Sequence, residues 1–349
     1  MRLPGACPKA NTPFGPCLEE SPRKKRTRLT GLRGAPSVAG LARPLPSAVF
    51  LSGSPLLSFA LPGRPFLKMH GLGNDFVIVD GRAEPFRPSA EVIRLICDRH
   101  EGIGGDQLLV IEQPTVPGAD GRMRIYNVDG TEAQTCLNAT RCVIWLLLQE
   151  SRKGSVVLET LGGAIEGSSP DAERVALRLG APRWDWDAIP LAESRDTLRL
   201  DLASGPLAEP TALSLGNPHL VCFVADRDAV DVPRWAPALQ NAPLLPEGAN
   251  IGVAELVAPD RLRLVVWERP GILTRACGSG ACAAVLAARR RGLTSESRVA
   301  VDMPGGLLEV EVRDDDGLVL TGPVAVAFSG HIPETMQRAG AAPDKESRP

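Results

Sequence analysis

Two cysteines stand in matching contexts in the two halves of the chain. Cys136 and Cys277 each begin a helix-length apolar segment, 136–149 and 277–290. At a helix N-terminus the helix dipole and the unpaired N–H groups favour a thiolate near neutral pH. Because a thiolate can remove a proton from carbon and a thiol can return one, the two residues predict acid/base chemistry.

Polar residues precede both cysteines at nearly equal distances along the chain. The spacing from Asn74 to Cys136 is almost the same as the spacing from Asn217 to Cys277. The other matched positions are Gln107 with Asn250 and Asn127 with Glu268. Every matched pair is separated by nearly the same offset, so the chain contains an internal repeat. We therefore expect two pseudo-symmetric domains whose like elements face each other across a cleft.

Inversion of a stereocentre requires such an arrangement. One group removes the α-proton from one face of the carbon while a second group delivers a proton to the other face, and the reverse reaction exchanges the roles. Backbone N–H groups at the two helix starts can bind a carboxylate and the charge that develops on it. Thiols on two sides of one carbon also lie close enough to cross-link. We therefore expect oxidation to cause a loss of activity that dithiothreitol reverses.

The remaining cysteines do not indicate a metal site or a disulfide framework. No two of the eight cysteines have Cys-x-x-Cys spacing, and the chain is too long for a disulfide-stapled mini-domain. A single cysteine before an apolar helix is usually a buried structural residue, but two with matched polar offsets favour a functional pair. The other cysteines are expected to be core residues (Cys97, Cys142, Cys222, Cys282) or to lie in the N-terminal segment (Cys7, Cys17).

Composition and charge divide the 349 residues into an extension and a folded region. Residues 1–64 carry a net charge of +8 and the remainder −10, and an acidic body argues against a nucleic-acid partner. No run approaches the roughly 20 apolar residues of a membrane-spanning helix. We interpret residues 1–64 as a disordered extension: an upstream stretch from a misplaced start, a genuine tail, or, least favoured, a targeting peptide. The expected domains are 65–181, completed by about 322–335, and 182–321, with a frayed tail at 336–349.

Hydrophobic periodicity predicts the elements of an α+β fold in which each domain has a curved sheet around a buried central helix. Besides the two apolar helices, a helix is expected at 89–99 with Ser89 as its cap. Strands are expected at 76–79, 107–112, 123–127, 155–159, 174–179, 219–224, 251–256, 261–267, 298–302, 306–312, 317–320 and 324–328.

The motifs together resemble the diaminopimelate epimerase family, from about Phe66 to His331. The segments that carry the resemblance are KMHGLGNDF (68–76), GIGGDQ (102–107), RIYNVDG (124–130), GNPH (216–219), ER (268–269) and ACGSGAC (276–282). The resemblance implies the fold of that family and the interconversion of LL- and meso-diaminopimelate without pyridoxal or any other cofactor. It also implies a place in lysine and peptidoglycan precursor biosynthesis and a cytoplasmic location, and it allows for a homodimer.

Roles carried over from the family fall on matching positions of this chain. Cys136 and Cys277 would be the acid/base thiols, with His219 and Glu268 as the supporting polar pair. The positions implied to hold the distal amino and carboxylate groups are Asn74, Asn127, Asn217, Asn250 and Arg269. The positions implied to line the reacting end are Gln107, Asn138, Gly278 and Ser279.

Two residues beside the site depart from the family pattern. Leu137 stands where the family has glycine, which adds bulk and disfavours a positive φ. Pro270 follows Glu268-Arg269 where the family has glycine, which removes one N–H donor. These departures leave two alternatives open, a catalytically impaired homologue and an epimerase of another amino acid.

Overall fold

The computed structural model describes residues 63–337. Most of the expected N-terminal extension and of the C-terminal tail, together with Cys7 and Cys17, lies outside the described residues. The first strand begins at Gly63, just before the predicted start near Phe66. Among the described residues no helix is long and apolar enough to cross a membrane.

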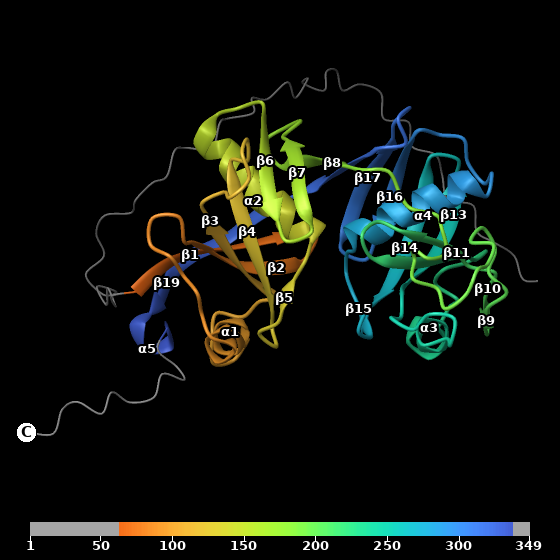
Figure 1. Cartoon of the computed structure of the whole chain (residues 1–349), viewed down its shortest axis with the longest axis horizontal. Helices are drawn as coiled ribbons and strands as arrows, with labels where there is room; N and C mark the ends of the chain where they lie inside the picture. The colour runs from red at the N-terminus through yellow and green to blue at the C-terminus, as the bar shows by residue number, and fades with distance from the viewer. Residues whose placement is uncertain (1–62, 338–349) are drawn as a thin grey trace, which may run out of the picture. The chain divides into compact units, whose positions relative to one another are not determined.

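The first half of the described chain is a sheet interrupted by two helices (Figure 1). In order the elements are β1 (Gly63–Gly71), β2 (Asn74–Asp80), α1 (Ala90–Cys97), β3 (Gln107–Glu112), β4 (Gly121–Asn127), β5 (Glu132–Ala133), α2 (Leu137–Ser151), β6 (Ser155–Thr160), β7 (Gly163–Ser168) and β8 (Arg174–Leu179). Strands β2 and β3 pair in parallel, β3 and β4 antiparallel, and β4 and β6 in parallel.

The second half repeats this pairing, and after two short strands that form a separate sheet its elements follow in the same order. They are β9 (Ala203–Ser204), β10 (Leu207–Ala208), β11 (Thr211–Ser214), β12 (Pro218–Phe223), α3 (Val232–Gln240), β13 (Asn250–Ala258), β14 (Arg261–Glu268), β15 (Ile272–Leu273), α4 (Gly278–Arg290), β16 (Arg298–Met303), β17 (Gly306–Val312) and β18 (Leu318–Pro323). Strands β12 and β13 are parallel, β13 and β14 antiparallel, and β14 and β16 parallel. The internal repeat predicted from the residue offsets is therefore a repeat of topology.

Each half is built around one buried helix, as predicted. Helix α2 packs against β4, β6, β7 and β8, and α4 packs against β11, β12, β13, β14 and β17 (Figure 1). The segment 281–288 of α4 is fully or almost fully buried and mostly alanine, so the sheet can approach the helix closely. In α2 the larger Val143, Ile144 and Leu147 fill the corresponding space. Both helices are apolar on nearly all sides because strands surround them.

Helices α1 (Ala90–Cys97) and α3 (Val232–Gln240) differ in how well the sequence predicted them. Helix α1 begins after Ser89, whose Oγ accepts a hydrogen bond from the backbone N–H of Val92 at 3.3 Å, as expected for an N-cap. Helix α3 was not expected. It carries a proline at its start, where a helix accepts one, and a second at Pro237 inside the helix, which weakens the local helical signal. Packing against β13 stabilises it in place of propensity.

The last strand returns to the first half of the chain. Strand β18 pairs with β8, and β19 (Ala325–Pro333) then pairs antiparallel with β1 along its whole length. The short helix α5 (Glu334–Gln337) follows. The division into domains at 65–181 and 182–321 stays a prediction.

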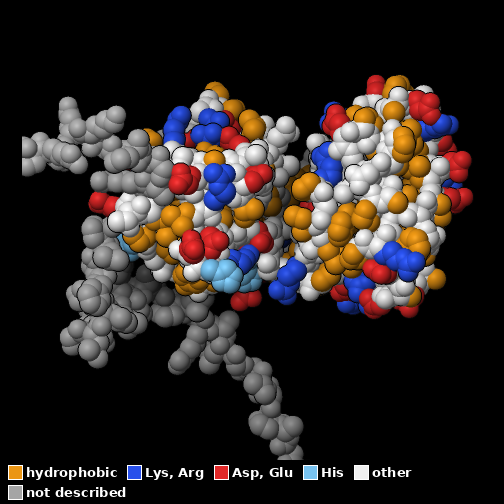
Figure 2. All heavy atoms as spheres, turned by 90° about the horizontal axis from the view of Figure 1, so that it is seen from below, with side chains coloured by type: hydrophobic (Ala, Val, Ile, Leu, Met, Phe, Trp, Pro, Cys, Tyr) orange, Lys and Arg blue, Asp and Glu red, His pale blue; other side chains and the backbone are white. Residues whose placement is uncertain are grey.

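Charged side chains of both signs are distributed over the surface. On the face seen in Figure 2, Lys and Arg side chains alternate with Asp and Glu side chains and do not form one continuous field. Many of them pair, as Arg82 does with Glu150 at 2.8 Å. Such exposed pairs contribute about 0–1 kcal/mol each, so they do not decide the fold.

Candidate active site

The candidate residues of the first half lie where four elements begin or end. Asn74 is the first residue of β2, Gln107 is the first residue of β3 and Asn127 is the last residue of β4. Because β2 and β3 are parallel and β4 is antiparallel to β3, these three residues share one edge of the sheet. Cys136 is the N-cap of α2, with an extended backbone at φ −150°.

The second half places its candidates in the same way. His219 lies at the start of β12, Asn250 is the first residue of β13 and Glu268 is the last residue of β14. His219 and Asn250 are directly opposite each other in the parallel pair. Cys277 is the N-cap of α4, with φ −131°. The two cysteines therefore occupy equivalent places in the two halves of the fold.

Cys136 lies in a network of amides that reaches the other half. Its Sγ is 3.7 Å from the Oδ1 atom of Asn74. The Nδ2 group of the buried Asn138 donates to that same Oδ1 atom at 3.1 Å and to the backbone carbonyl of Ala276 at 3.0 Å. Ala276 directly precedes Cys277, so one amide side chain connects the starts of both central helices.

Cys277 lies in a second polar chain. Its Sγ accepts a hydrogen bond from the backbone N–H of Gly280 at 3.4 Å and is 3.6 Å from the Oγ atom of Ser279. Ser279 Oγ accepts from the Nδ2 group of Asn217 at 3.4 Å, and the Oδ1 atom of Asn217 is 3.1 Å from the Nε2 atom of His219. The cysteine, the serine, the asparagine and the histidine thus form one connected group.

The histidine supports this chain without carrying a charge. Burial, and then the nearby Arg269 guanidinium, lower the pKa of His219 to about 3. The imidazole is therefore neutral near neutral pH. Since the amide oxygen of Asn217 can only accept, the Nε2 atom of His219 is assigned as the donor.

Burial opposes the ionisation of both thiols. It raises the pKa of Cys136 to about 11, although the N–H groups of Ala139 and Asn138 act in the other direction. Burial also raises the pKa of Cys277 well above its usual value. The sequence predicted thiolates near neutral pH, whereas the raised pKa values favour the protonated thiols. The reason is that the cost of desolvation exceeds the effect of the helix-start N–H groups.

One carboxylate acts on both thiols. After burial, the charge of Glu268 raises the pKa of both Cys136 and Cys277. Glu268 is itself half-buried, and its burial raises its pKa, while its Oε1 atom accepts a hydrogen bond from Thr274 Oγ1 at 2.5 Å. Because the charge of Glu268 acts on both thiols, the starts of the two helices that carry these thiols must lie near each other.

The remaining candidates hold one another in pairs. The Oδ1 atom of Asn250 accepts from the backbone N–H of Arg269 at 3.0 Å, so Pro270 does not remove this contact. The Nη1 group of Arg269 donates to the Glu247 carbonyl at 2.9 Å. In the first half, Gln107 Nε2 donates to Asn127 Oδ1 at 2.9 Å.

One of these pairs also leaves an acceptor unused. The Oε1 atom of Gln107 is buried and has no hydrogen-bond partner among residues 63–337. A buried acceptor of this kind is costly unless a ligand or water supplies a donor.

The bulk of Leu137, which departs from the family pattern, is accommodated between the two halves. It is the first residue of α2 and does not have a positive φ, so a glycine conformation is not needed there. Its side chain packs against the core clusters of both halves. A Cβ built on Gly278, the first residue of α4, would lie 3.0 Å from the Leu137 Cβ. The bulk of Leu137 is therefore accommodated by the absence of a side chain at its symmetry-related position.

Three residues outside the predicted set contact it. Asp106 Oδ2 accepts from Asn74 Nδ2 at 2.8 Å, Thr274 holds Glu268, and Arg141 donates through Nη2 to Asn138 Oδ1 at 2.8 Å. Asp106 could have been suspected from its place directly before Gln107 in the GIGGDQ segment. Arg141 could also have been suspected, because it is the one charged residue of the otherwise largely apolar segment 136–149.

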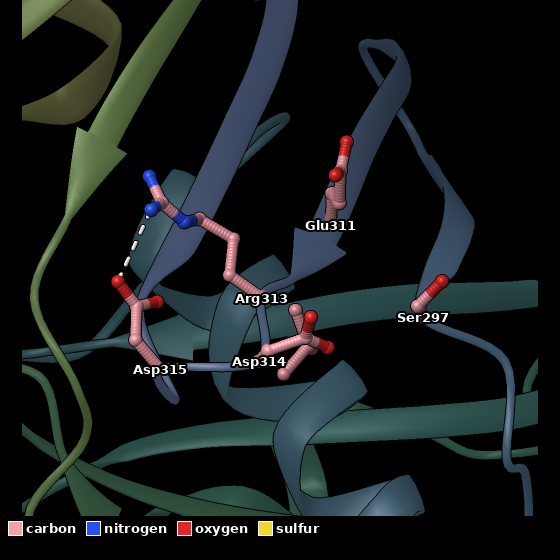
Figure 3. A pocket seen from close by; sticks show the side chains of 6 residues that line it. Ser297, Glu311, Arg313, Asp314 and Asp315 are labelled. Atoms are coloured by element: carbon pink, nitrogen blue, oxygen red, sulfur yellow. Dashed lines mark hydrogen bonds and ion pairs between the residues drawn. The ribbon is translucent and has the colours of Figure 1, made fainter.

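A separate hollow of about 340 Å³ lies at the surface beyond β17 (Figure 3). It is lined by Ser297, Glu311, Val312, Arg313, Asp314 and Asp315. Arg313 and Asp315 pair across 3.1 Å there. None of the predicted site residues lines it. No group of three or more His, Cys, Asp or Glu side chains within the described part of the chain is arranged to hold a metal ion.

Solved structures with this architecture define its fold class. A PhzF-family phenazine biosynthesis protein from Bacillus anthracis superposes with a TM-score of 0.57 at 17% identity, over 78% of this chain and 99% of that protein. A hydroxyproline epimerase from Agrobacterium vitis superposes with a TM-score of 0.54 at 15% identity, over 78% and 94% of the two chains. At these identities the likeness concerns the fold, which is the two-part α+β fold common to these proteins.

Sequence comparison assigns the family. The family model described as diaminopimelate epimerase matches residues 66–184 and 211–327. A diaminopimelate epimerase of Phenylobacterium zucineum is 47% identical over 278 residues, which are 78% of this chain and 99% of that relative. One from Rhodospirillum centenum is 45% identical over 273 residues, 78% and 94% of the two chains. The chain belongs to the diaminopimelate epimerase family.

Proposed function

We propose that this isomerase interconverts LL- and meso-diaminopimelate by moving protons between Cys136, Cys277 and the two faces of one α-carbon. The observation that carries the proposal is the meeting of the two cysteine-capped helix starts. Asn138 joins them through its bonds to Asn74 and to the Ala276 carbonyl. The names of the relatives support the substrate. We place the activity in lysine and peptidoglycan precursor biosynthesis and in the cytoplasm, where reducing conditions keep thiols free.

The proposed reaction conserves protons. The thiolate of one cysteine takes the α-proton and becomes a thiol, and the electron pair of the C–H bond moves into the adjacent carboxylate. The opposite thiol then protonates the carbon on its other face and becomes a thiolate. N–H groups at the starts of α2 and α4, including those of Gly278 and Ser279, are suited to bind the charged carboxylate. The reverse reaction uses the same groups in exchanged roles.

The substrate would supply what the buried thiols lack. Burial raises the pKa of both thiols, so an added positive charge is needed to favour a thiolate. The α-ammonium group of an amino acid carries that charge. It is also a donor for the unpartnered Oε1 atom of Gln107. Substrate binding and thiol ionisation are therefore coupled in this proposal.

The distal end of the substrate would be held by the polar residues of both halves. Arg269 can bind a carboxylate through two parallel N–H···O bonds. The amides assigned to the distal amino and carboxylate groups are Asn74, Asn127, Asn217 and Asn250. Their present partners, such as Asp106 for Asn74, orient them for this role.

The test measures conversion of each diaminopimelate isomer into the other, together with exchange of the α-proton in D₂O. With wild type we expect both, and with Cys136→Ala or Cys277→Ala we expect conversion to fall by at least about a thousandfold, because each substitution removes the acid/base group on one face of the carbon. Cys222→Ala is the matched control, since this thiol is buried in a different core cluster and should leave exchange unchanged. Conversion between the isomers at the wild-type rate in either site variant would refute the two-thiol mechanism.

A further inference from the structure

Arg141 is a buried cation without a counter-charge. It lies in the second turn of α2, and none of its side chain is exposed. Its Nη2 group donates to Asn138 Oδ1 at 2.8 Å and its Nη1 group to the Leu137 carbonyl at 3.4 Å. Its Nε atom has no partner, and no carboxylate of residues 63–337 forms an ion pair with it. An unpaired buried charge destabilises a fold, so the presence of this one calls for a reason.

The fold makes space for this guanidinium on two sides. A Cβ at Gly71 in β1 would lie 2.9 Å from the Nη2 atom of Arg141, and one at Gly322 in β18 would lie 3.1 Å from its Nε atom. Glycine at both positions lets the two strands close over the planar group. Arg141 is therefore held in a fitted slot that joins strands from both ends of the chain.

The acidic groups that act on Arg141 are thiols. Burial lowers the pKa of Arg141, and the groups that act in the opposite direction are Cys142, Cys136 and Cys282. Arginine nevertheless stays protonated in proteins. Cys142 and Cys282 are fully buried in the two cores, whereas Cys136 is half-buried at the site. Of these three thiols, Cys136 is therefore the one whose thiolate could take part in a reaction at the site.

The internal repeat shows that only the half that contains Cys136 carries this positive charge. At the offset that relates Cys136 to Cys277, Arg141 corresponds to the neutral Cys282. At the same offset Asn127 corresponds to Glu268, whose charge raises the pKa of the Cys277 thiol. The pseudo-symmetric site therefore has a cation on the Cys136 side and a carboxylate on the Cys277 side.

We infer that Arg141 is a positioning residue that makes Cys136, rather than Cys277, the thiol that first carries negative charge. The inference rests on the proposed two-thiol function and adds a direction to it. Arg141 acts through space and through its bond to Asn138, and it need not touch the substrate. The charged and titratable groups that act on Cys136 are Glu268, Arg141 and Cys142, and Glu268 also acts on Cys277.

The experiment measures alkylation of each cysteine by iodoacetamide as a function of pH, with mass spectrometry to separate the sites. The midpoint in pH is compared rather than the rate at one pH, because Cys277 is less accessible than Cys136. In wild type we expect the midpoint of Cys136 to lie about one pH unit or more below that of Cys277. A lower midpoint for Cys277 would overturn the inference without any variant.

Variants test the role of the guanidinium itself. Arg141→Met should raise the midpoint of Cys136 by about one unit, a tenfold loss of thiolate at a given pH, and change Cys277 much less. Arg141→Lys keeps the charge and should restore most of the shift. Arg291→Met is the control, since it removes another mostly buried guanidinium that lies beside Cys222. An unchanged Cys136 midpoint in folded Arg141→Met would refute the inference.

The two proposals can fail separately. Alkylation reports the order of ionisation and needs no turnover, whereas exchange in D₂O reports the reaction. If Cys136 ionises first but neither isomer exchanges its α-proton, the proposed function is wrong and the inference stands. If exchange depends on both cysteines but the ionisation order is reversed, the inference alone is wrong.

Discussion

The contact between the first residues of α2 and α4 sets the spacing of the two helix starts. A methyl group added by Gly278→Ala would lie 3.0 Å from Leu137 Cβ and 2.9 Å from Leu320 Cδ2. The end of the Leu320 side chain can rotate away, but Leu137 Cβ is attached to the helix backbone. We therefore expect Gly278→Ala to push the starts of α2 and α4 apart.

The magnitude follows from the distances. Carbon atoms in contact lie about 3.5–4.0 Å apart, so the helices must separate by roughly 0.5–1 Å. Overpacking of this kind costs about 1–3 kcal/mol of unfolding free energy. A displacement of about 1 Å between reacting groups costs about a hundredfold in rate, so exchange should fall by roughly ten- to a hundredfold.

The assay is a double-mutant cycle with Leu137→Gly, which removes the atom in conflict. Urea denaturation gives the unfolding free energy, and α-proton exchange in D₂O gives the activity. Leu137→Gly alone should lower stability by about 2 kcal/mol or more, since its side chain packs on both cores. In the double variant Gly278→Ala should cost less than it does in wild type, with a coupling energy of about 1–2 kcal/mol.

Gly154→Ala is the control, since its added Cβ would have no atom within 4 Å. This change should stay within about 0.5 kcal/mol of wild type. Additive effects of the two site substitutions would refute the reasoning. Full activity of Gly278→Ala alone would also refute it, because the spacing of the helix starts would then not be limiting.

Three further predictions follow from the site and the cores. Glu268→Gln removes the carboxylate that, after burial, raises the pKa of Cys277, so alkylation of this thiol should reach its midpoint at lower pH, while a higher midpoint would contradict the assignment. Asp106→Ala frees the Nδ2 group of Asn74, so the KM for diaminopimelate should rise more than kcat falls, and steady-state kinetics will detect the opposite pattern if it occurs. Burial raises the pKa of the Cys222 thiol from 9.0 to about 12, so the unfolded state loses its proton first and stability should fall as pH rises from about 9 to 12; urea denaturation should show a smaller loss in Cys222→Ala.

Local patterns in the sequence predicted most of the elements and their positions in the fold. Strand β3 and strand β8 have the predicted bounds, and Ser89 caps α1 as expected. These features depend on neighbouring residues, namely alternation in strands and a capping side chain before a helix. Helix α3 was missed because its stability comes from packing on β13, which no local pattern contains.

Some features of the candidate site likewise follow from the sequence, and others depend on the tertiary structure. The residue types, their repeated offsets and the places of Cys136 and Cys277 before apolar helices follow from the sequence, because they are set by order along one chain. Tertiary structure alone decided that burial outweighs the helix-start N–H groups, that Leu137 fits against Gly278, and that Arg141 has thiols as its acidic neighbours. Each of these depends on desolvation and on contacts between residues far apart in the chain, which the order of residues does not specify until the fold brings them together.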